Sequence, residues 1–128
     1  MAPYRKGQNV RNRMLLALPR EVRDQLLRHC HFVDFPYGHV IYSAGDPIEQ
    51  VYFVESGLVS LIRTMKDGRS AEICAVGIEG VTGLLAAYGF DRALAEYVVQ
   101  VPLVALRINR KTLRHQISVK HALRGLVA

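Results

Sequence analysis

Histidine and cysteine are the side chains of this sequence best suited to metal or redox chemistry, and they are few and scattered. The chain has two cysteines, Cys30 and Cys74, and five histidines. An iron–sulfur cluster needs about four cysteine ligands, which one copy of the chain cannot supply. We expect both cysteines to be free, buried thiols. Residue type alone, with no supporting pattern, makes the following side chains candidates for an axial haem ligand: His29, Cys30, His31, His39, Cys74, His115 and His121.

The same side chains do not form a recognisable enzyme motif. A metal-dependent cupin enzyme needs clustered histidine and carboxylate ligands that face the inside of a β-barrel. His39 stands alone in the strand-rich region, and His31 is the only other histidine near it. The sequence contains no nucleophile elbow, phosphate-binding P-loop or catalytic pair of carboxylates. We therefore expect a protein that is not an enzyme and has no metal site, with a cupin-like metal enzyme as a less favoured alternative.

Charge is distributed unevenly along the 128 residues. Residues 1–30 carry seven lysines and arginines against two acids, residues 31–96 carry four against nine, and residues 97–128 carry six against none. The central part is therefore acidic, and both flanks are basic. Basic flanks suit nucleic acid, although solvated helix faces are the commoner cause of such charge. A phosphate-binding site would have to lie within the acidic centre.

The length of the chain suits one domain. No apolar run approaches the roughly 20 residues that a membrane-spanning helix needs. The apolar stretch 14–18 is too short for the core of a signal peptide. We expect a soluble, cytoplasmic protein with no membrane contact.

Short β-rich segments separated by turn residues dominate the middle of the chain. Asp67-Gly68 is typical of a tight hairpin turn, and Pro102 suits a strand end better than a strand centre. The evenly spaced segments predict a mainly β fold with flanking helices, an antiparallel β jelly-roll barrel. The predicted strands cover about 32–35, 40–43, 50–55, 58–65, 70–76, 95–101 and 104–109.

Helices are predicted on both sides of these strands. Pro19 suits the first turn of a helix whose buried stripe is formed by Val22, Leu26 and Cys30. Residues 77–89 predict a loop that enters a short helix. Asn109 can cap a helix that runs from residue 110 to about 117, and a further helix is expected from about residue 120. Residues 1–11 are expected to form a flexible polar tail.

Three segments carry a resemblance to a known family. They are NRMLLALPREVRDQLLRHC, VIYSAGDPIEQVYFVESGLVSL with its turn residues Gly45, Asp46, Pro47 and Gly57, and MKDGRSAEICAVGIEGVTGL. Together they resemble the cyclic-nucleotide-binding domain of Crp/Fnr-type bacterial regulators. The resemblance covers residues 12–128. It implies a sensor domain that ends at the start of a dimerisation helix, without the helix-turn-helix domain that follows in the family.

The resemblance also implies where a ligand would bind. In the family, a Gly-Glu pair opens a short helix whose amides take the cyclic phosphate, and an arginine about ten residues later pairs with its charge. Here Gly83 is followed by Leu84 instead of glutamate, and the arginine position falls on Leu94, Ala93 or Glu96. The nearest arginine is Arg92.

The ligand-facing residues implied by this alignment are Gly80, Thr82, Gly83, Leu84 and Arg92. Two ordinary roles stay open beside this one. Arg92 is equally a candidate for a solvated loop charge, and Leu84 and Leu85 are candidates for simple core packing. Because both polar groups of the family's site are replaced, we expect cyclic AMP and cyclic GMP to bind weakly or not at all, and we expect no cofactor.

The sequence therefore favours the ligand-sensing domain of a transcription regulator with a degenerate cyclic-nucleotide pocket. Its effector is an unknown small molecule, a homodimer would form through the C-terminal helix if the chain continues, and DNA would be contacted only through an output domain. The alternative is a nucleic-acid or protein interaction module that acts through the basic flanking helices. The side chains for that alternative are Arg107, Arg110, Lys111, Arg114, Lys120 and Arg124.

Overall fold

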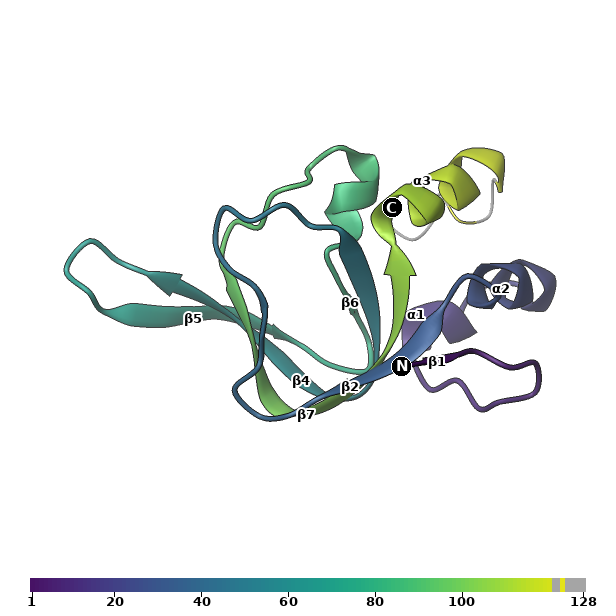
Figure 1. Ribbon diagram of the computed structural model, residues 1–128, viewed down its shortest axis with the longest axis horizontal. Helices are drawn as coiled ribbons and strands as arrows, with labels where there is room; N and C mark the ends of the chain where they lie inside the picture. Colours follow the sequence, from purple (N-terminus) through teal and green to yellow (C-terminus); the bar gives the residue numbers. More distant parts are fainter. Residues whose placement is uncertain (121–122, 124–128) are drawn as a thin grey trace.

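The computed structural model describes residues 1–120 and Leu123. Seven strands form one antiparallel sheet in the order β1-β2-β7-β4-β5, with β3 added to β7 and β6 added to β4 (Figure 1). The mainly β architecture with flanking helices is confirmed, but the sheet is not closed into a barrel. The strands are β1 (Ala2–Pro3), β2 (His31–Phe35), β3 (Val40–Tyr42), β4 (Gln50–Thr64), β5 (Ser70–Val76), β6 (Val81–Thr82) and β7 (Glu96–Asn109).

Two pairs of predicted strands are each one long strand. β4 runs through Gly57, where the register with β7 shifts, and β7 runs through Pro102 at the facing position. Proline has no N–H to donate to the ladder, and an irregular pairing tolerates that loss. Strands β4 and β7 approach each other so closely at this point that a Cβ on Gly57 would lie 2.3 Å from the carbonyl oxygen of Pro102. The bulge therefore joins segments that turn-like residues made us expect to be separate.

The helices gather on one side of the sheet, and the β4–β5 hairpin projects on the other (Figure 1). Helix α2 begins directly after Pro19 as predicted, and Asn109 caps α3 by accepting from the backbone N–H groups of Lys111 and Thr112. The sequence did not predict α1 or β6. The predicted helix beyond residue 120 lies outside the described residues, apart from Leu123. The helices are α1 (Arg13–Leu16), α2 (Arg20–Leu27), the 3₁₀ helix η1 (Leu84–Tyr88) and α3 (Arg110–Val119).

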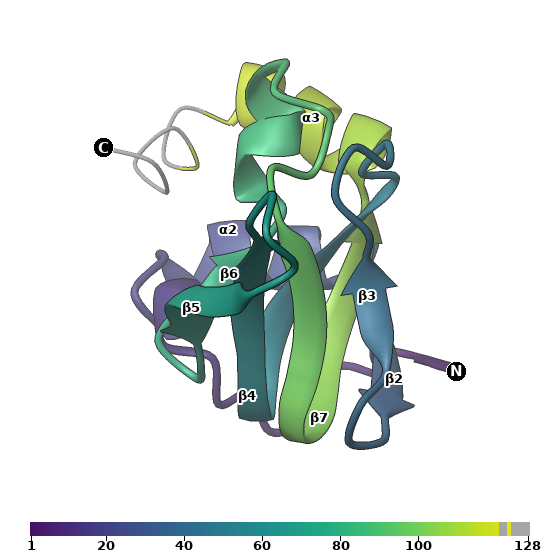
Figure 2. The same ribbon diagram turned by 90° about the vertical axis from the view of Figure 1, so that its left-hand side faces the viewer.

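The sheet separates two hydrophobic clusters. The helix-side cluster holds Leu26, Phe53 and Leu106 with the buried residues of the helices. The sheet-side cluster holds Tyr42, Val54 and other residues on the concave face. Strand β7 supplies both, since alternate residues of a strand face opposite ways. The second view places η1 and α3 together at one end of the strands (Figure 2).

The N-terminal segment is joined to the sheet at several points. Residues 2 and 3, in the segment expected to be a flexible tail, form β1 and pair with β2. Further along, the buried carboxylate of Glu55 accepts hydrogen bonds from the backbone N–H groups of Arg11 and Asn12 at 2.8–3.0 Å. Asn12 in turn donates its side-chain amide to the carbonyl oxygens of Val54 and Gly80. These contacts order the chain just before α1.

The two cysteines differ in exposure. Cys30 is fully buried, as expected, and lies between the end of α2 and the start of β2, whereas Cys74 is exposed. The expectation of two buried thiols is therefore wrong for Cys74. Its strand, β5, lies at the edge of the sheet, where nearly every residue is exposed.

Candidate functional site

A cavity of about 430 Å³ lies between the concave face of the sheet and the segment that contains η1. This volume is within the range of sites for small organic ligands. Aliphatic and aromatic side chains form most of its wall. The lining residues are Ile48, Leu61, Val76, Val81, Gly83, Leu84, Leu85, Ala86, Gly89, Phe90, Asp91, Arg92, Leu94 and Tyr97.

Gly83 sets the shape of the cavity floor. Its φ of +80° is in the left-handed region, and it immediately precedes η1. A Cβ at this position would lie 2.7 Å from the hydroxyl oxygen of Tyr42 and 2.9 Å from Cγ2 of Ile48. Only glycine satisfies both the conformation and the space. Leu84, which follows, lines the cavity and also packs against the helix-side cluster, so its position is compatible with both roles considered for it.

The five residues implied by resemblance divide into two groups. Gly83, Leu84 and Arg92 line the cavity, whereas Gly80 and Thr82 do not. The carbonyl of Gly80 accepts from Asn12, and the buried hydroxyl of Thr82 lies 3.3 Å from that of Tyr42. Their contacts thus support the wall of the cavity from outside. A ligand-binding role for the five residues stays a prediction.

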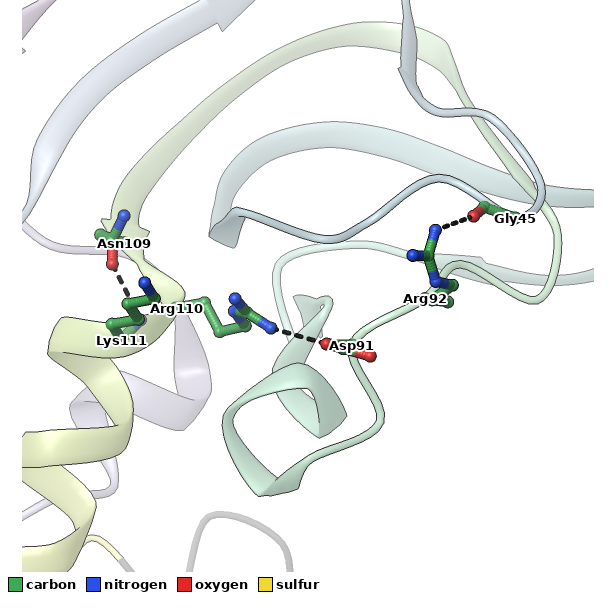
Figure 3. A network of polar contacts seen from close by, with 6 residues as sticks. All are labelled: Gly45, Asp91, Arg92, Asn109, Arg110 and Lys111. Carbon is green, nitrogen blue, oxygen red and sulfur yellow. Dashed lines mark hydrogen bonds and ion pairs between the residues drawn. The ribbon is translucent and has the colours of Figure 1, made fainter.

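Arg92 is exposed at the rim of the cavity. Its Nη1 donates to the carbonyl oxygen of Gly45 at 3.0 Å (Figure 3). Its backbone also pairs with Pro47. The turn residues Gly45 and Pro47 therefore fix the loop that carries this guanidinium. Leu94, one of the three positions that the resemblance allows for the family's arginine, is 85% exposed. It lines the rim with an apolar surface.

Asp91 connects the cavity to helix α3. Its carboxylate forms an ion pair with Nη1 of Arg110 at 3.0 Å, and Arg110 is the first residue of α3 (Figure 3). The backbone reinforces this link, because Ile48 donates to the carbonyl of Asp91 and Arg110 donates to that of Glu49. One connected set of bonds thus joins two cavity-lining segments to the start of α3. Sequence reasoning missed it, since the partners lie far apart along the chain.

Tyrosines form a further part of the site that the sequence analysis missed. Tyr42 and Tyr97 meet edge to face, with ring centroids 4.8 Å apart, and Tyr97 lines the cavity. Burial raises the pKa of Tyr42 far above its ordinary value, although the hydrogen bond with the Thr82 side chain acts in the opposite direction. Burial also raises the pKa of Tyr97, and the neighbouring Cys74 adds to the increase. Both phenols are neutral near pH 7.

The residues considered for metal chemistry are not assembled into a site in the described part of the chain. There, no group of three or more His, Cys, Asp or Glu side chains is arranged to hold a metal ion. His39 instead stacks on the ring of Phe35 with centroids 4.3 Å apart.

The six basic residues do not act as one set. Arg107 lines a different cavity with Phe35 and Val104, because its position on β7 faces away from the helices, and Arg110 is paired with Asp91. Arg124 lies outside the described residues.

The sequence model of the cyclic nucleotide-binding domain matches residues 32–119, which include the cavity and α3. The chain belongs to the cyclic nucleotide-binding domain family. This confirms the resemblance to Crp/Fnr-type domains on which the expected fold depended. In the described part of this domain, no helix combines the length and hydrophobicity needed to cross a membrane.

Relatives of the domain include bacterial transcription regulators. A CRP-like cAMP-activated global transcriptional regulator of Mycobacterium tuberculosis is 28% identical over 86 residues, which are 67% of this chain and 38% of that protein. This chain thus spans well under half of that relative. The N-terminal domain of a transcriptional regulator from Streptomyces coelicolor superposes with a TM-score of 0.76 at 24% identity, covering 91% of this chain and 82% of that one. The Thermus thermophilus catabolite activator protein gives 0.77 at 22% identity, with 89% and 54% covered.

Proposed function

We propose that this domain is the ligand-sensing part of a Crp/Fnr-type transcription regulator, with a small-molecule effector bound in the cavity beside η1. The observation that carries the proposal is the cavity itself, which occupies the site implied by the family resemblance but has an apolar wall. The proposed role is regulatory and non-catalytic. DNA contact and dimerisation would belong to parts of a longer protein.

The composition of the wall argues against tight binding of a cyclic nucleotide. Leu84 stands where the family has the glutamate that accepts from the ribose, so a ribose hydroxyl would lose that partner. Among the described residues that line the cavity, Arg92 is the one cation, and it stands at the exposed rim, where solvent weakens its pairing with a phosphate. Charge-assisted hydrogen bonds contribute roughly 1.5–3 kcal/mol each, so their loss would weaken nucleotide affinity by orders of magnitude.

The ion pair between Asp91 and Arg110 supplies a route from ligand to output. A ligand that contacts the loop of Asp91 would favour one position of that loop, and the bonds to Arg110 would transmit the preference to α3. Such coupling requires only that the ligand bind two arrangements with different affinity. Arg110 is half of the pair but does not line the cavity, so it can be changed without touching a ligand.

The proposal is tested by titrating the domain with cyclic AMP and cyclic GMP in a calorimeter and by a thermal-melt screen that adds cyclic dinucleotides and small apolar acids. We expect no sub-micromolar binding of the mononucleotides. An apolar compound at a hundred times its dissociation constant would add roughly 2.7 kcal/mol, or about ten degrees in the unfolding midpoint.

The variant Leu85→Trp is the control for the site, because Leu85 lines the cavity yet is half exposed, so a larger ring fills the opening without crowding the core. It should remove the thermal shift. Sub-micromolar binding of cyclic AMP would overturn the degenerate pocket, and shifts that survive Leu85→Trp would place the ligand elsewhere.

A further inference from the structure

The charges at the cavity are unequally compensated. Asp91 and Arg92 are the two lining residues with formal charge at neutral pH. The carboxylate of Asp91 faces the guanidinium of Arg110 at 3.0 Å. In the described part of the chain, the side chain of Arg92 donates one hydrogen bond, and its acceptor is the neutral carbonyl of Gly45. The rim therefore carries a cation without a counter-charge above an apolar interior.

A guanidinium has five N–H donors, of which Arg92 uses one on Gly45 (Figure 3). The remaining donors suit a carboxylate or a phosphate oxygen pair. The neighbouring carboxylate of Asp91 is paired with Arg110, so Arg92 alone offers a positive charge at the described wall that no acid offsets. A ligand with one negative charge is thus favoured over a dianion such as a phosphate monoester.

The body of the ligand is constrained by the rest of the wall. Leu61, Leu84 and Tyr97 present hydrocarbon or a neutral aromatic ring to the cavity, and burial raises the pKa of the Tyr97 phenol. Polar groups on a ligand would be desolvated there without partners, at a cost in affinity. An unbranched or aromatic hydrocarbon body has no polar groups, so it loses no hydrogen bonds to water when it enters the cavity.

Building on the proposed function, we propose that the effector is a carboxylic acid with an apolar body, whose carboxylate pairs with Arg92 at the rim while its hydrocarbon fills the cavity. This assigns Arg92 as the residue that selects the head group. The volume of the cavity limits the size of the hydrocarbon body. The charges of Arg92 and Asp91 together determine the preferred charge of the ligand's head group.

Four probes with eight carbon atoms each test the head group: octanoate, octanol, octylamine and octyl phosphate, each titrated by calorimetry at pH 7. Octanoate should bind most tightly and octylamine most weakly, with octyl phosphate weaker than octanoate. The variant Arg92→Leu should weaken octanoate about five- to tenfold, a moderate loss because the rim is exposed to solvent, and should change octanol less than twofold.

Matched variants separate this role from general effects of charge. Arg63→Leu removes an exposed arginine of β4 that is not part of the cavity wall and should leave all four affinities unchanged. Arg92→Lys keeps the charge and should retain part of the preference for octanoate. Leu85→Trp should weaken every probe that binds in this cavity.

Equal binding of octanoate and octanol, or octanoate binding that ignores Arg92→Leu, would overturn the carboxylate assignment while leaving a small-molecule cavity in place. Tighter binding of octyl phosphate than of octanoate would overturn the single-charge argument. Failure of all four probes would overturn the apolar acid, and the nucleotide titrations above would then decide separately whether the cavity has kept the family's ligand.

Discussion

At the scale of single residues, Cys30 makes the free energy of unfolding depend on pH. Its thiol is fully buried, and burial raises its pKa from 9.0 to about 12. Between these values the unfolded chain has lost the proton that the folded chain keeps, so stability is complete below about pH 9 and falls as the pH rises toward 12. The maximum slope is about 1.4 kcal/mol per pH unit.

We expect urea titrations at pH 8, 9, 9.5 and 10 to show this decline, and Cys30→Ala to reduce its slope whatever the variant does to the stability at pH 8. The raised pKa of Tyr42 adds a similar effect only above about pH 10, the ordinary value for tyrosine. Cys74→Ala, at an exposed position, is the matched control and should keep the wild-type slope. An unchanged slope in Cys30→Ala would contradict the prediction.

Residue-level prediction from sequence went furthest where the signal is local. Gly83 was named from a resembling motif and Arg92 as the nearest arginine to the expected position, and both line the cavity, while their role toward a ligand stays a prediction. Glu55, Tyr97 and the partner of Asp91 were missed, because their roles depend on residues tens of positions away. A buried carboxylate such as Glu55 gives no local signal, because the donors that it accepts hydrogen bonds from are backbone N–H groups at residues 11 and 12.

At the scale of elements, the close pairing of β4 and β7 at their bulge depends on one glycine. Gly57→Ala would place a methyl group 2.3 Å from a backbone oxygen of Pro102, and φ there is +93°. We expect a loss of at least about 3 kcal/mol in the free energy of unfolding, since backbone on both strands would have to move. Gly38→Ala has a similar φ of +84° but no atom near the added carbon, so it should cost about 1 kcal/mol.

Urea denaturation of the two variants measures this difference directly. Similar losses for Gly57→Ala and Gly38→Ala would show that the two strands can separate at the bulge, contrary to the close approach described above.

Elements were predicted well where their ends are marked by local chemistry. The caps at Pro19 and Asn109 and the loop entering η1 are where the sequence placed them. The junctions at Gly57 and Pro102 were read as strand ends, since turn residues and bulge residues are the same amino acids. The two-residue strand β6 is defined only by its pairing with β4, which no local pattern reports.

At the scale of the whole molecule, one curved sheet separates two cores. An open sheet and a closed barrel share the same alternation of buried and exposed residues, so strand patterns predicted the class of fold but not the absence of closure. The pairing of β7 with both β2 and β4 makes it the common wall of the helix-side and sheet-side clusters. A substitution that destabilises the packing of one cluster should therefore destabilise the other cluster as well.

Because β7 is shared by the two clusters, we expect the domain to unfold in a single cooperative transition. Leu103→Ala removes side-chain atoms from the sheet-side cluster and Leu106→Ala from the helix-side cluster, and each should cost about 2–5 kcal/mol. In both variants the urea midpoint from helix ellipticity should match the midpoint from tyrosine fluorescence. The chain has six tyrosines and no tryptophan, and Tyr42, Tyr52 and Tyr97 belong to or pack against the sheet-side cluster. Val101→Ala, at a half-exposed position of the same strand, is the control and should shift both midpoints little. Separate midpoints in either leucine variant would mean that the two cores unfold independently, and β7 could then not carry a change at the cavity to the helices beyond it.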